Sequence, residues 1–588
     1  MKHVFILALS FLFVEMSAQT TQWGVPTGNV KFPKGEYKEL PDPARKDAAA
    51  WKSVKGTNLS WGTTDLRYSK GAVPALKKKV VTESLKGWRG ERVSAQALVW
   101  SATPLANLTF EMSSLKGKSS LIPASAAFVR YVMQDNFLTC GYRKSSSEYD
   151  STLIAEPIDH LAKCLPLEAQ TARPIWVSVW IPQSATAGDY KGVLTVKNGA
   201  TVIGKLNLSV NVVNRVLPKP TEWSYHLDFW QNPFAEARYA GLKVFTPEFF
   251  EFVRPQFERL RDAGQKVITT SIMHKPWGGQ TEDYFESMIT WMKRADGTWA
   301  FDYTAFDLWV NYMMKLGIDK QIACYSMIPW NMSFKYYDQT TNSMQELKTT
   351  TDTPEYAEMW TAVLQSLSKH LREKGWFDRT VIAMDERSPK DMQNAFRIIA
   401  TADPEFKVSL AGSNHPEMEA QLYDYSMASD DLFKPEVLAK RHAKGQKSTF
   451  YTCCAQKYPN MFTYSLPAEN EWISWFAAAK GYDGYLRWAY NSYTKEPLLD
   501  ARFRAFQSGD SYLVYPEART SIRFEKFVDG VEMYEKIALL RKDFKAKGDT
   551  KSLKQIDKVL KTFSIENFKR GIAPQRTLNE ARKAINAL

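Results

Sequence analysis

Cysteine is scarce in this sequence. Only five cysteines occur among the 588 residues, and their spacing matches no metal-binding motif. If the chain is exported, a disulfide between Cys140 and Cys164 is the expected pairing. The adjacent Cys453 and Cys454 lie in a strand-like run, and we expect them to be buried thiols.

Long apolar runs are absent beyond the N-terminus. The one such run, Val4 to Val14, follows the basic start Lys2–His3 and is too short to span a bilayer. Residues 1–18 therefore predict a signal peptide, and the lack of a cysteine near Ala18 argues against a lipid anchor. We expect an exported protein, periplasmic or secreted, with no stable membrane insertion.

Nucleotide-binding and nucleic-acid-binding signals are also missing. No GxGxxG and no phosphate-binding loop occurs. The formal net charge is +13, but Lys and Arg are scattered, and the densest run is only Lys77–Lys79. This pattern predicts a solvated basic surface and no nucleic-acid partner. Asp228 and His274 could be taken for two metal ligands, but no third ligand is evident, so we expect no metal and no cofactor.

The chain is long enough for two or three domains. Residues 20–215 predict an antiparallel β-sandwich, because "RPIWVSVWIP" (173–182) alternates apolar positions and "YKGVLTVKNGATVIGKLNLSVNVV" (190–213) has the pattern of strand, turn and strand. A proline-containing linker, 214–223, follows. Residues 516–588 predict helices packed on the domain before them.

Residues 216–515 have a different sequence pattern, in which short apolar strands alternate with longer helical segments. We expect an α/β fold, a (β/α)8 TIM-like barrel, with an open doubly wound sheet as the alternative. The eight predicted strands are 224–230, 266–274, 321–331, 380–386, 407–414, 423–429, 448–454 and 484–491.

Polar and aromatic side chains gather at the predicted strand ends, where barrel enzymes place their active sites. Flat aromatic rings can cover the apolar faces of sugars, while amides and carboxylates can bind hydroxyl groups. The candidate substrate-binding residues are Asp228, Trp230, His274, Trp330, Asn331, Asn414, Tyr451, Trp488, Tyr490 and Asn491.

Two adjacent acids, Asp385 and Glu386, follow an apolar strand directly. Two other acid pairs occur, Glu282–Asp283 and Asp430–Asp431, and neither follows such a strand. An adjacent acid pair is a weak signal by itself, since strand-end solvation or a helix N-cap would also explain it. Its place at the end of the fourth strand favours catalysis.

Four stretches together resemble glycoside hydrolase family 123, the retaining β-N-acetylgalactosaminidases. They are "HLDFWQNP" (226–233), "AMDERSP" (383–389), "GYLRWAYN" (484–491) and "SGDSYLVYP" (508–516). The acid pair is also similar to that of the family 20 hexosaminidases. The resemblance covers nearly the whole mature chain and implies a glycan substrate with terminal β-linked N-acetylgalactosamine.

The resemblance also implies substrate-assisted catalysis, in which the sugar's 2-acetamido oxygen attacks C1. Asp385 would then orient the acetamido group, and Glu386 would act as general acid and base. Tyr490, or its rival Tyr451, would bind the acetamido oxygen, and Trp488 or Trp330 would stack on the sugar. At a strand end the backbone can turn, so we expect both carboxyl groups to reach one pocket.

Two alternatives stay open from the sequence. The first keeps the mechanism and changes the sugar to β-N-acetylglucosamine. The second is a non-catalytic glycan-binding protein on the same scaffold.

Overall fold

The computed structural model describes residues 34–44, 46–143 and 149–588. The predicted signal peptide lies outside these residues. No helix within the described ranges is long and apolar enough to cross a membrane.

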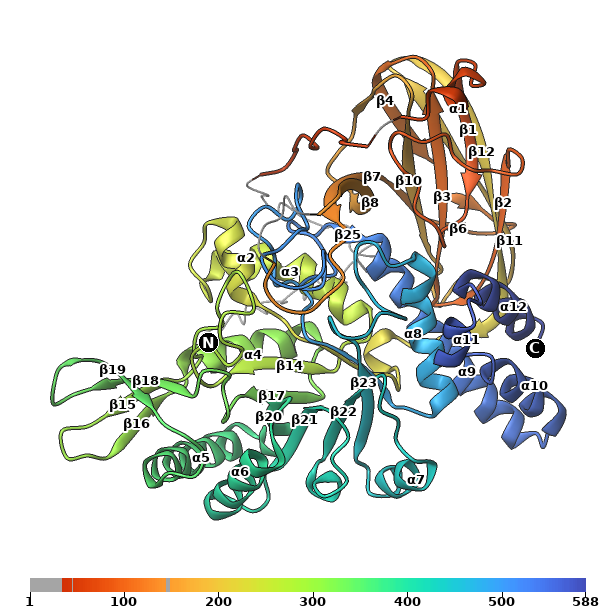
Figure 1. The fold of residues 1–588 in the computed structure, drawn as a ribbon. Coiled ribbons are helices and arrows are strands. Elements are labelled where there is room, and N and C mark those ends of the chain that lie inside the picture. The colour runs from red at the N-terminus through yellow and green to blue at the C-terminus, as the bar shows by residue number, and fades with distance from the viewer. Residues whose placement is uncertain (1–33, 45, 144–148) are drawn as a thin grey trace, which may run out of the picture.

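The N-terminal part is a sandwich of two sheets, drawn in red to yellow in Figure 1. Inward-facing residues of both sheets, such as Val177 and Val210, form one hydrophobic core, as the alternating pattern predicts. The first sheet has the order β1 (Thr57–Gly62), β3 (Arg92–Ser101), β10 (Thr171–Trp180), β7 (Ala124–Asp135), β8 (Ser151–Asp159) and β25 (Thr520–Ser521). The second has the order β2 (Thr82–Arg89), β12 (Thr201–Val216), β11 (Gly188–Asn198), β4 (Leu105–Met112) and β9 (Leu165–Leu167), with β5 (Leu115–Lys116) and β6 (Leu121–Ile122) beside it.

The central part is a parallel eight-stranded barrel, and all eight predicted strands are present. In chain order they are β13 (His226–Phe229), β14 (Val267–Ser271), β17 (Gln321–Tyr325), β20 (Thr380–Asp385), β21 (Lys407–Gly412), β22 (Asp424–Ala428), β23 (Lys447–Tyr451) and β24 (Gly484–Arg487). The surrounding helices are α2 (Pro233–Ala240), α3 (Pro247–Asp262), α4 (Thr304–Leu316), α5 (Pro354–Lys374), α6 (Pro389–Ala402), α7 (Pro435–Ala443) and α8 (Pro467–Lys480).

The barrel is nearly closed, and side chains complete its seam. β13 and β14 share no continuous ladder, only a single bridge between Leu227 and Gln265. The Gln265 amide accepts from the Phe229 N–H at 3.0 Å and donates to the Phe229 carbonyl at 3.1 Å. Gln231 makes the equivalent pair of bonds on the other strand, accepting from the Thr269 N–H and donating to the Val267 carbonyl. Two side-chain amides thus replace the missing peptide groups of the ladder.

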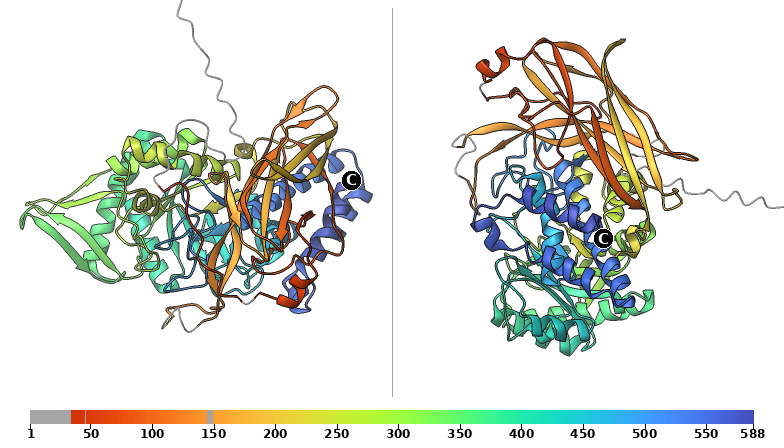
Figure 2. Two further views of the ribbon diagram at one scale, coloured as in Figure 1. Left: turned by 90° about the horizontal axis from the view of Figure 1, so that it is seen from above. Right: turned by 90° about the vertical axis from the view of Figure 1, so that its right-hand side faces the viewer.

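A separate four-stranded sheet projects from the barrel and has no counterpart in the sequence prediction. It contains β16 (Trp299–Asp302), β15 (Thr290–Lys293), β18 (Ser333–Asp338) and β19 (Ser343–Lys348). Figures 1 and 2 show this arm extending away from both the sandwich and the C-terminal helices. It is inserted after the second and third barrel strands.

The C-terminal segment is helical, as predicted, and joins the sandwich to the barrel. It consists of α9 (Ile522–Ala546), α10 (Thr550–Leu560), α11 (Ile565–Lys569) and α12 (Pro574–Asn586). The short α1 (Ala48–Lys52) lies in the sandwich region. Buried ion pairs connect α9 to the sandwich: Arg523 pairs with Glu156 of β8 at 2.5 Å, and Lys536 pairs with Glu91, in the turn between β2 and β3, at 2.8 Å. The right-hand view of Figure 2 shows these blue helices between the sandwich and the lower part of the barrel.

Candidate active site

The alternation of helix-facing and inward-facing residues along the barrel strands explains why a pocket forms. Residues whose side chains face the helices are large, for example Ile382, Met384 and Phe450. Inward-facing positions near the carboxyl ends of the strands include the small residues Ala383 and Ala411. Small side chains in this layer leave space at the carboxyl end of the barrel.

The resulting cavity holds about 540 Å³ of empty space, part of which is open to solvent. Side chains from seven of the eight strand ends line it. The lining residues are Trp230, Trp277, Gln280, Trp330, Asp385, Glu386, Ala411, Tyr451, Cys453, Cys454, Leu486, Trp488, Phe506 and Asp510.

Asp385 is the last residue of β20 and faces into the barrel with Val381 and Ala383. Its Oδ2 accepts a hydrogen bond from the Trp330 indole N–H at 3.0 Å, and Arg387 approaches Oδ1 at 3.4 Å. The Arg387 guanidinium also lies 4.3 Å from the centre of the Trp330 ring. Burial raises the pKa of Asp385, and the Arg387 charge opposes that rise.

Glu386 would face the helices if β20 continued, because neighbouring strand residues alternate. Instead its φ is +42°, in the left-handed region that non-glycine residues seldom adopt. This turn brings Glu386 into the pocket beside Asp385. Such a conformation costs on the order of 1–3 kcal/mol, and strain of this kind concentrates at functional sites.

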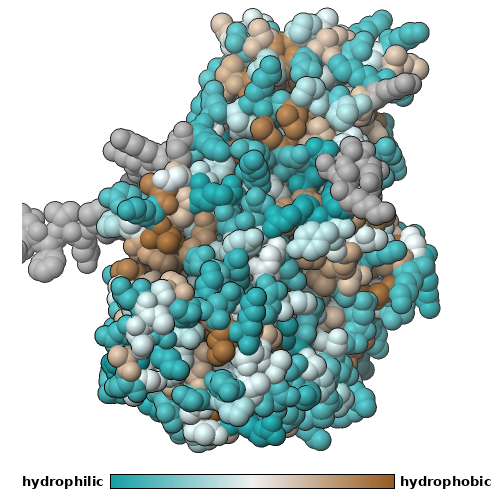
Figure 3. All heavy atoms as spheres, turned by 60° about the vertical axis from the view of Figure 1, so that its left-hand side comes forward, coloured by the Kyte–Doolittle hydropathy of each residue, from teal (hydrophilic) through white to brown (hydrophobic). Residues whose placement is uncertain are grey.

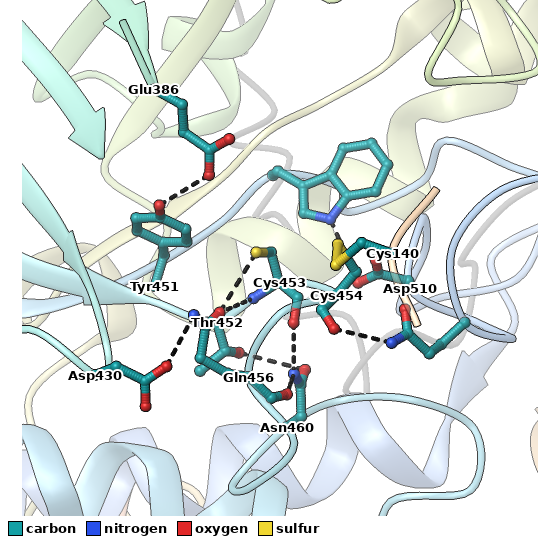
Figure 4. Close-up of a disulfide and its surroundings, with 12 residues drawn as sticks. Cys140, Glu386, Asp430, Tyr451, Thr452, Cys453, Cys454, Gln456, Asn460 and Asp510 are labelled. Carbon is teal, nitrogen blue, oxygen red and sulfur yellow. Dashed lines mark hydrogen bonds between the residues drawn. A yellow bond between two sulfur atoms is a disulfide. The ribbon is translucent and has the colours of Figure 1, made fainter. Parts of the chain in front are cut away.

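Tyr451, at the end of β23, fixes the Glu386 carboxyl group. Its hydroxyl donates to Glu386 Oε1 at 2.9 Å, as Figure 4 shows. Burial raises the pKa of Glu386, the Asp385 charge raises it further, and the Tyr451 hydrogen bond opposes both. The site therefore favours a protonated Glu386 next to a second carboxyl group.

Indole rings supply much of the remaining wall. Trp230 and Trp277 stack with their ring centres 4.8 Å apart. Trp330 is 40% exposed and stands at the rim, and Trp488 approaches Asp510 with its indole nitrogen at 3.4 Å. Of the predicted substrate-binding residues, the structure thus brings Trp230, Trp330, Tyr451 and Trp488 to one cavity.

Several other predicted residues lie elsewhere, and two are deeply buried. The Tyr490 hydroxyl donates to the Gln256 carbonyl at 3.0 Å, and the Asn491 amide bonds Asn232 and Glu236. Both residues have no exposed surface. They lie beyond the end of β24 at Arg487, where the chain turns toward α2 and α3. Their contacts support the fold, and they do not line the pocket.

The remaining candidates also lie outside the cavity lining. Asp228 occupies the inward layer below Trp230, and burial and the charge of Asp424 raise its pKa well above the usual value. His274 pairs through Nδ1 with Glu286 at 2.6 Å. Asn331 and Asn414 are exposed in loops.

The structure also corrects the predicted disulfide. Cys140 bridges Cys454, 314 residues away, and not Cys164, which is a free, exposed thiol. Cys453 is a free thiol that is only half-buried, and Cys454 forms the disulfide, so the expectation of two buried thiols was wrong. Figure 4 shows the bridge next to the pocket residues Cys453 and Asp510.

Eight lining residues were not among the predicted site residues: Trp277, Gln280, Ala411, Cys453, Cys454, Leu486, Phe506 and Asp510. Asp510 lies within "SGDSYLVYP", so that stretch held a usable signal. Gln280 and Phe506 lie in long loops, and no sequence pattern marks them as site residues. Within the described part of the chain, no group of three or more His, Cys, Asp or Glu residues could hold a metal ion.

Comparison with known proteins identifies the family. The model of the glycoside hydrolase 123 catalytic domain matches residues 230–540, more than half of the chain, and that of the glycoside hydrolase 123 N-terminal domain matches residues 61–198. A comparison with curated protein sequences finds no match.

Solved structures agree with the family match. A family 123 glycoside hydrolase from Clostridium perfringens, studied for glycolipid glycan hydrolysis, is 25% identical with a TM-score of 0.79, covering 91% of this chain and 97% of its own. A family 39 glycoside hydrolase from Bacteroides cellulosilyticus is 10% identical over 72% of this chain and 80% of its own, and its TM-score of 0.32 carries no argument. The chain belongs to glycoside hydrolase family 123.

Proposed function

We propose that this glycoside hydrolase releases terminal β-linked N-acetylgalactosamine from glycans by substrate-assisted catalysis, with retention of configuration. The observation that carries the proposal is the convergence of the adjacent Asp385 and Glu386 in one aromatic pocket. In other retaining glycosidases two separated carboxyl groups flank the bond, and one of them is the nucleophile. Adjacent residues fit better when the substrate supplies its own nucleophile.

In this mechanism the acetamido carbonyl oxygen attacks C1 while the bond from C1 to the glycosidic oxygen breaks. Glu386 gives its proton to the departing oxygen, which leaves as an alcohol. Asp385 accepts a hydrogen bond from the acetamido N–H and balances the positive charge of the oxazolinium ion. Water then attacks C1, gives a proton to Glu386 and restores the acetamido group.

The site suits these two roles. Glu386 has a raised pKa and can carry the transferable proton, while Arg387 and Trp330 favour the ionised form of Asp385. Tyr451 is the phenol at the pocket, and its hydroxyl orients Glu386, whereas Tyr490 is committed to Gln256. Among the indoles, Trp330 and Trp488 are partly exposed and can cover the sugar ring.

The natural substrate and the location of the enzyme are part of the same proposal. Work on the Clostridium perfringens relative concerned glycolipid glycans, so we infer that a glycolipid glycan is one candidate substrate. The predicted signal peptide points to export. A disulfide between residues 314 positions apart suits an oxidising compartment.

Hydrolysis of paired aryl β-N-acetylgalactosaminide and β-N-acetylglucosaminide tests the proposal. We expect the wild type to prefer the galactosaminide and Asp385→Asn to lose most activity on either sugar. Glu386→Gln should lose about 10²- to 10⁴-fold on a natural glycan and much less on the aryl glycoside, whose leaving group needs little acid assistance. Glu373→Gln, on the exposed surface of α5, is the charge-removal control.

Three outcomes would count against the proposal. A preference for glucosaminide would change the sugar and keep the mechanism. Full activity of Asp385→Asn would remove substrate assistance. A folded wild type that binds glycans and hydrolyses neither sugar would favour a binding role.

A further inference from the structure

The sandwich domain contributes to the mouth of the pocket. Its segment Cys140–Arg143 pairs with the loop after the eighth barrel strand. The Arg143 N–H donates to the Arg504 carbonyl at 3.0 Å, the Phe506 N–H donates to the Gly141 carbonyl at 3.3 Å, and an antiparallel bridge joins Tyr142 to Ala505. Phe506 lines the pocket, so the sandwich segment supports the pocket wall directly.

The same segment is anchored on both sides of Tyr142. The Cys140–Cys454 bridge attaches it to a residue that lines the pocket. Arg143 is buried, forms an ion pair with Asp135 and lies 4.4 Å from the centre of the Phe137 ring. Tyr142 lies between these anchors, yet 68% of its surface is exposed.

A second exposed tyrosine lies close by, on a barrel loop. Tyr284 is 41% exposed. A Cβ atom on Gly279 would lie 3.8 Å from the Tyr142 hydroxyl and 4.0 Å from the Tyr284 ring, so both side chains border this glycine. The next residue, Gln280, lines the pocket.

The barrel loop is itself attached to the loop that pairs with Tyr142. Arg504 donates to the carbonyl oxygens of Gly279 at 2.9 Å and Thr281 at 2.8 Å and pairs with Glu282 at 2.5 Å. Lys275 lies 3.8 Å from the centre of the Tyr284 ring. These contacts hold the two segments that carry Tyr142 and Tyr284 next to the pocket.

Large exposed aromatics that are held rigidly beside a cavity are typical of binding surfaces. The face in Figure 3 shows the more usual surface, where hydrophobic residues form small groups among hydrophilic ones. An enzyme that removes a terminal sugar must let the rest of the glycan leave through the pocket mouth. The sugar next to the cleaved bond then lies over the rim.

We propose that Tyr142 and Tyr284 form the binding site for the sugar that follows the cleaved bond. This inference rests on the proposed function and extends it, because it gives the sandwich domain a part in substrate selection. Tyr142 supplies a flat ring from one domain, and Tyr284 supplies a second ring from the other. Cys140 is a positioning residue that keeps the Tyr142 segment at the rim.

Two substrates separate this site from the catalytic pocket. One is N-acetyl-β-galactosaminyl azide, which has no second sugar. The other is a disaccharide with N-acetylgalactosamine β-linked to galactose. KM and kcat are measured on both for the wild type, Tyr142→Ala, Tyr142→Phe, Tyr284→Ala and Cys140→Ser. Tyr337→Ala, on the projecting arm, serves as the control for loss of a tyrosine ring elsewhere.

Tyr142→Ala and Tyr284→Ala should each raise KM for the disaccharide about three- to tenfold, in the range of one lost aromatic contact. Their kcat/KM for the azide should stay within about twofold of the wild type. Tyr142→Phe keeps the ring and should behave as wild type on both substrates. Cys140→Ser should raise KM for the disaccharide more than KM for the azide.

The possible failures are distinct. A wild type that hydrolyses neither substrate overturns the proposed function and this inference with it. An active wild type whose tyrosine variants handle the disaccharide normally overturns this inference alone. Equal losses on azide and disaccharide would show that the tyrosines support the catalytic pocket, which also contradicts the proposed site.

Discussion

The Tyr451 hydroxyl donates a hydrogen bond of 2.9 Å to Oε1 of Glu386. The two residues end neither the same strand nor neighbouring ones, since Tyr451 closes β23 and Glu386 follows β20. The contact can form because the left-handed conformation of Glu386 directs its side chain across the barrel mouth. One phenol therefore orients the proposed general acid and lowers its pKa against the effects of burial and of Asp385.

Tyr451→Phe should move the alkaline limb of the kcat/KM profile to higher pH. The hydrogen bond stabilises the ionised carboxylate and so lowers the pKa of Glu386. Without it the pKa rises, and Glu386 stays protonated to higher pH. We expect kcat to fall as well, because the carboxyl group loses its orientation. The measurement is kcat/KM for a natural glycan from pH 4 to 9, and an unmoved alkaline limb would contradict the assignment of Glu386 as the acid.

Trp330→Phe should shift the acid limb of the same kcat/KM profile to higher pH. The indole N–H bond lowers the pKa of Asp385 and opposes the effect of burial, so its loss makes Asp385 protonate at higher pH. Phenylalanine keeps an aromatic ring against the Arg387 guanidinium and removes only the indole N–H donor. Hydrogen bonds to charged groups contribute about 1.5–3 kcal/mol, so kcat/KM should fall roughly ten- to hundredfold.

Trp299→Phe, in the projecting arm, provides the matched control. The pH profile of kcat/KM for this variant should overlay that of the wild type. If Trp330→Phe lowers activity equally at every pH, Trp330 acts by packing on the sugar and not through the ionisation of Asp385.

Much of the barrel was predictable because its signal is local. Strands such as 380–386 are short apolar runs between helical segments, and each run contains its own evidence. The strand ends were predictable for the same reason, and they identified Asp385, Glu386, Trp230 and Trp488. The left-handed turn at Glu386 was expected only in outline, since strand parity alone directs that side chain toward the helices.

Features formed by distant segments could not be predicted. Cys140 and Cys454 meet only after the sandwich docks on the barrel, and sequence proximity favoured Cys164 instead. Tyr490 and Asn491 looked like strand-end residues, but β24 ends at Arg487 and the chain then turns into buried contacts with α2 and α3. The arm is assembled from two separate insertions and has no continuous pattern.

Gln265→Leu should destabilise the barrel by opening its seam. The change leaves the buried Phe229 N–H without its acceptor, while the Phe229 carbonyl keeps the hydrogen bond from the Gln231 amide. One unsatisfied buried group costs about 1–3 kcal/mol, so the free energy of unfolding should fall by about that amount. Denaturant titration measures the loss. Gln393→Leu, at an exposed position of α6, should change little, and an equal effect of both variants would refute the role of Gln265.

Glu39→Gln should destabilise the protein at neutral pH and much less in acid. The Glu39 carboxylate accepts hydrogen bonds from Arg173 at 2.6 Å and Arg130 at 2.9 Å, and only 7% of its side chain is exposed. Burial would raise its pKa, but the charges of Arg173 and Arg130 outweigh burial and lower the pKa to about 2 from an ordinary value of 4.5.

A carboxyl group whose pKa is depressed on folding stabilises the folded state above its unfolded pKa, and this contribution disappears as the pH falls through the folded pKa. For Glu39 the contribution is on the order of 3 kcal/mol above pH 4.5 and vanishes toward pH 2. The difference in unfolding free energy between wild type and Glu39→Gln should therefore narrow between pH 5 and pH 3 in urea titrations. The exposed Glu36→Gln should show no such narrowing. A difference in unfolding free energy that stays constant with pH would mean that the Glu39 side chain stabilises the fold by packing and not through its charge.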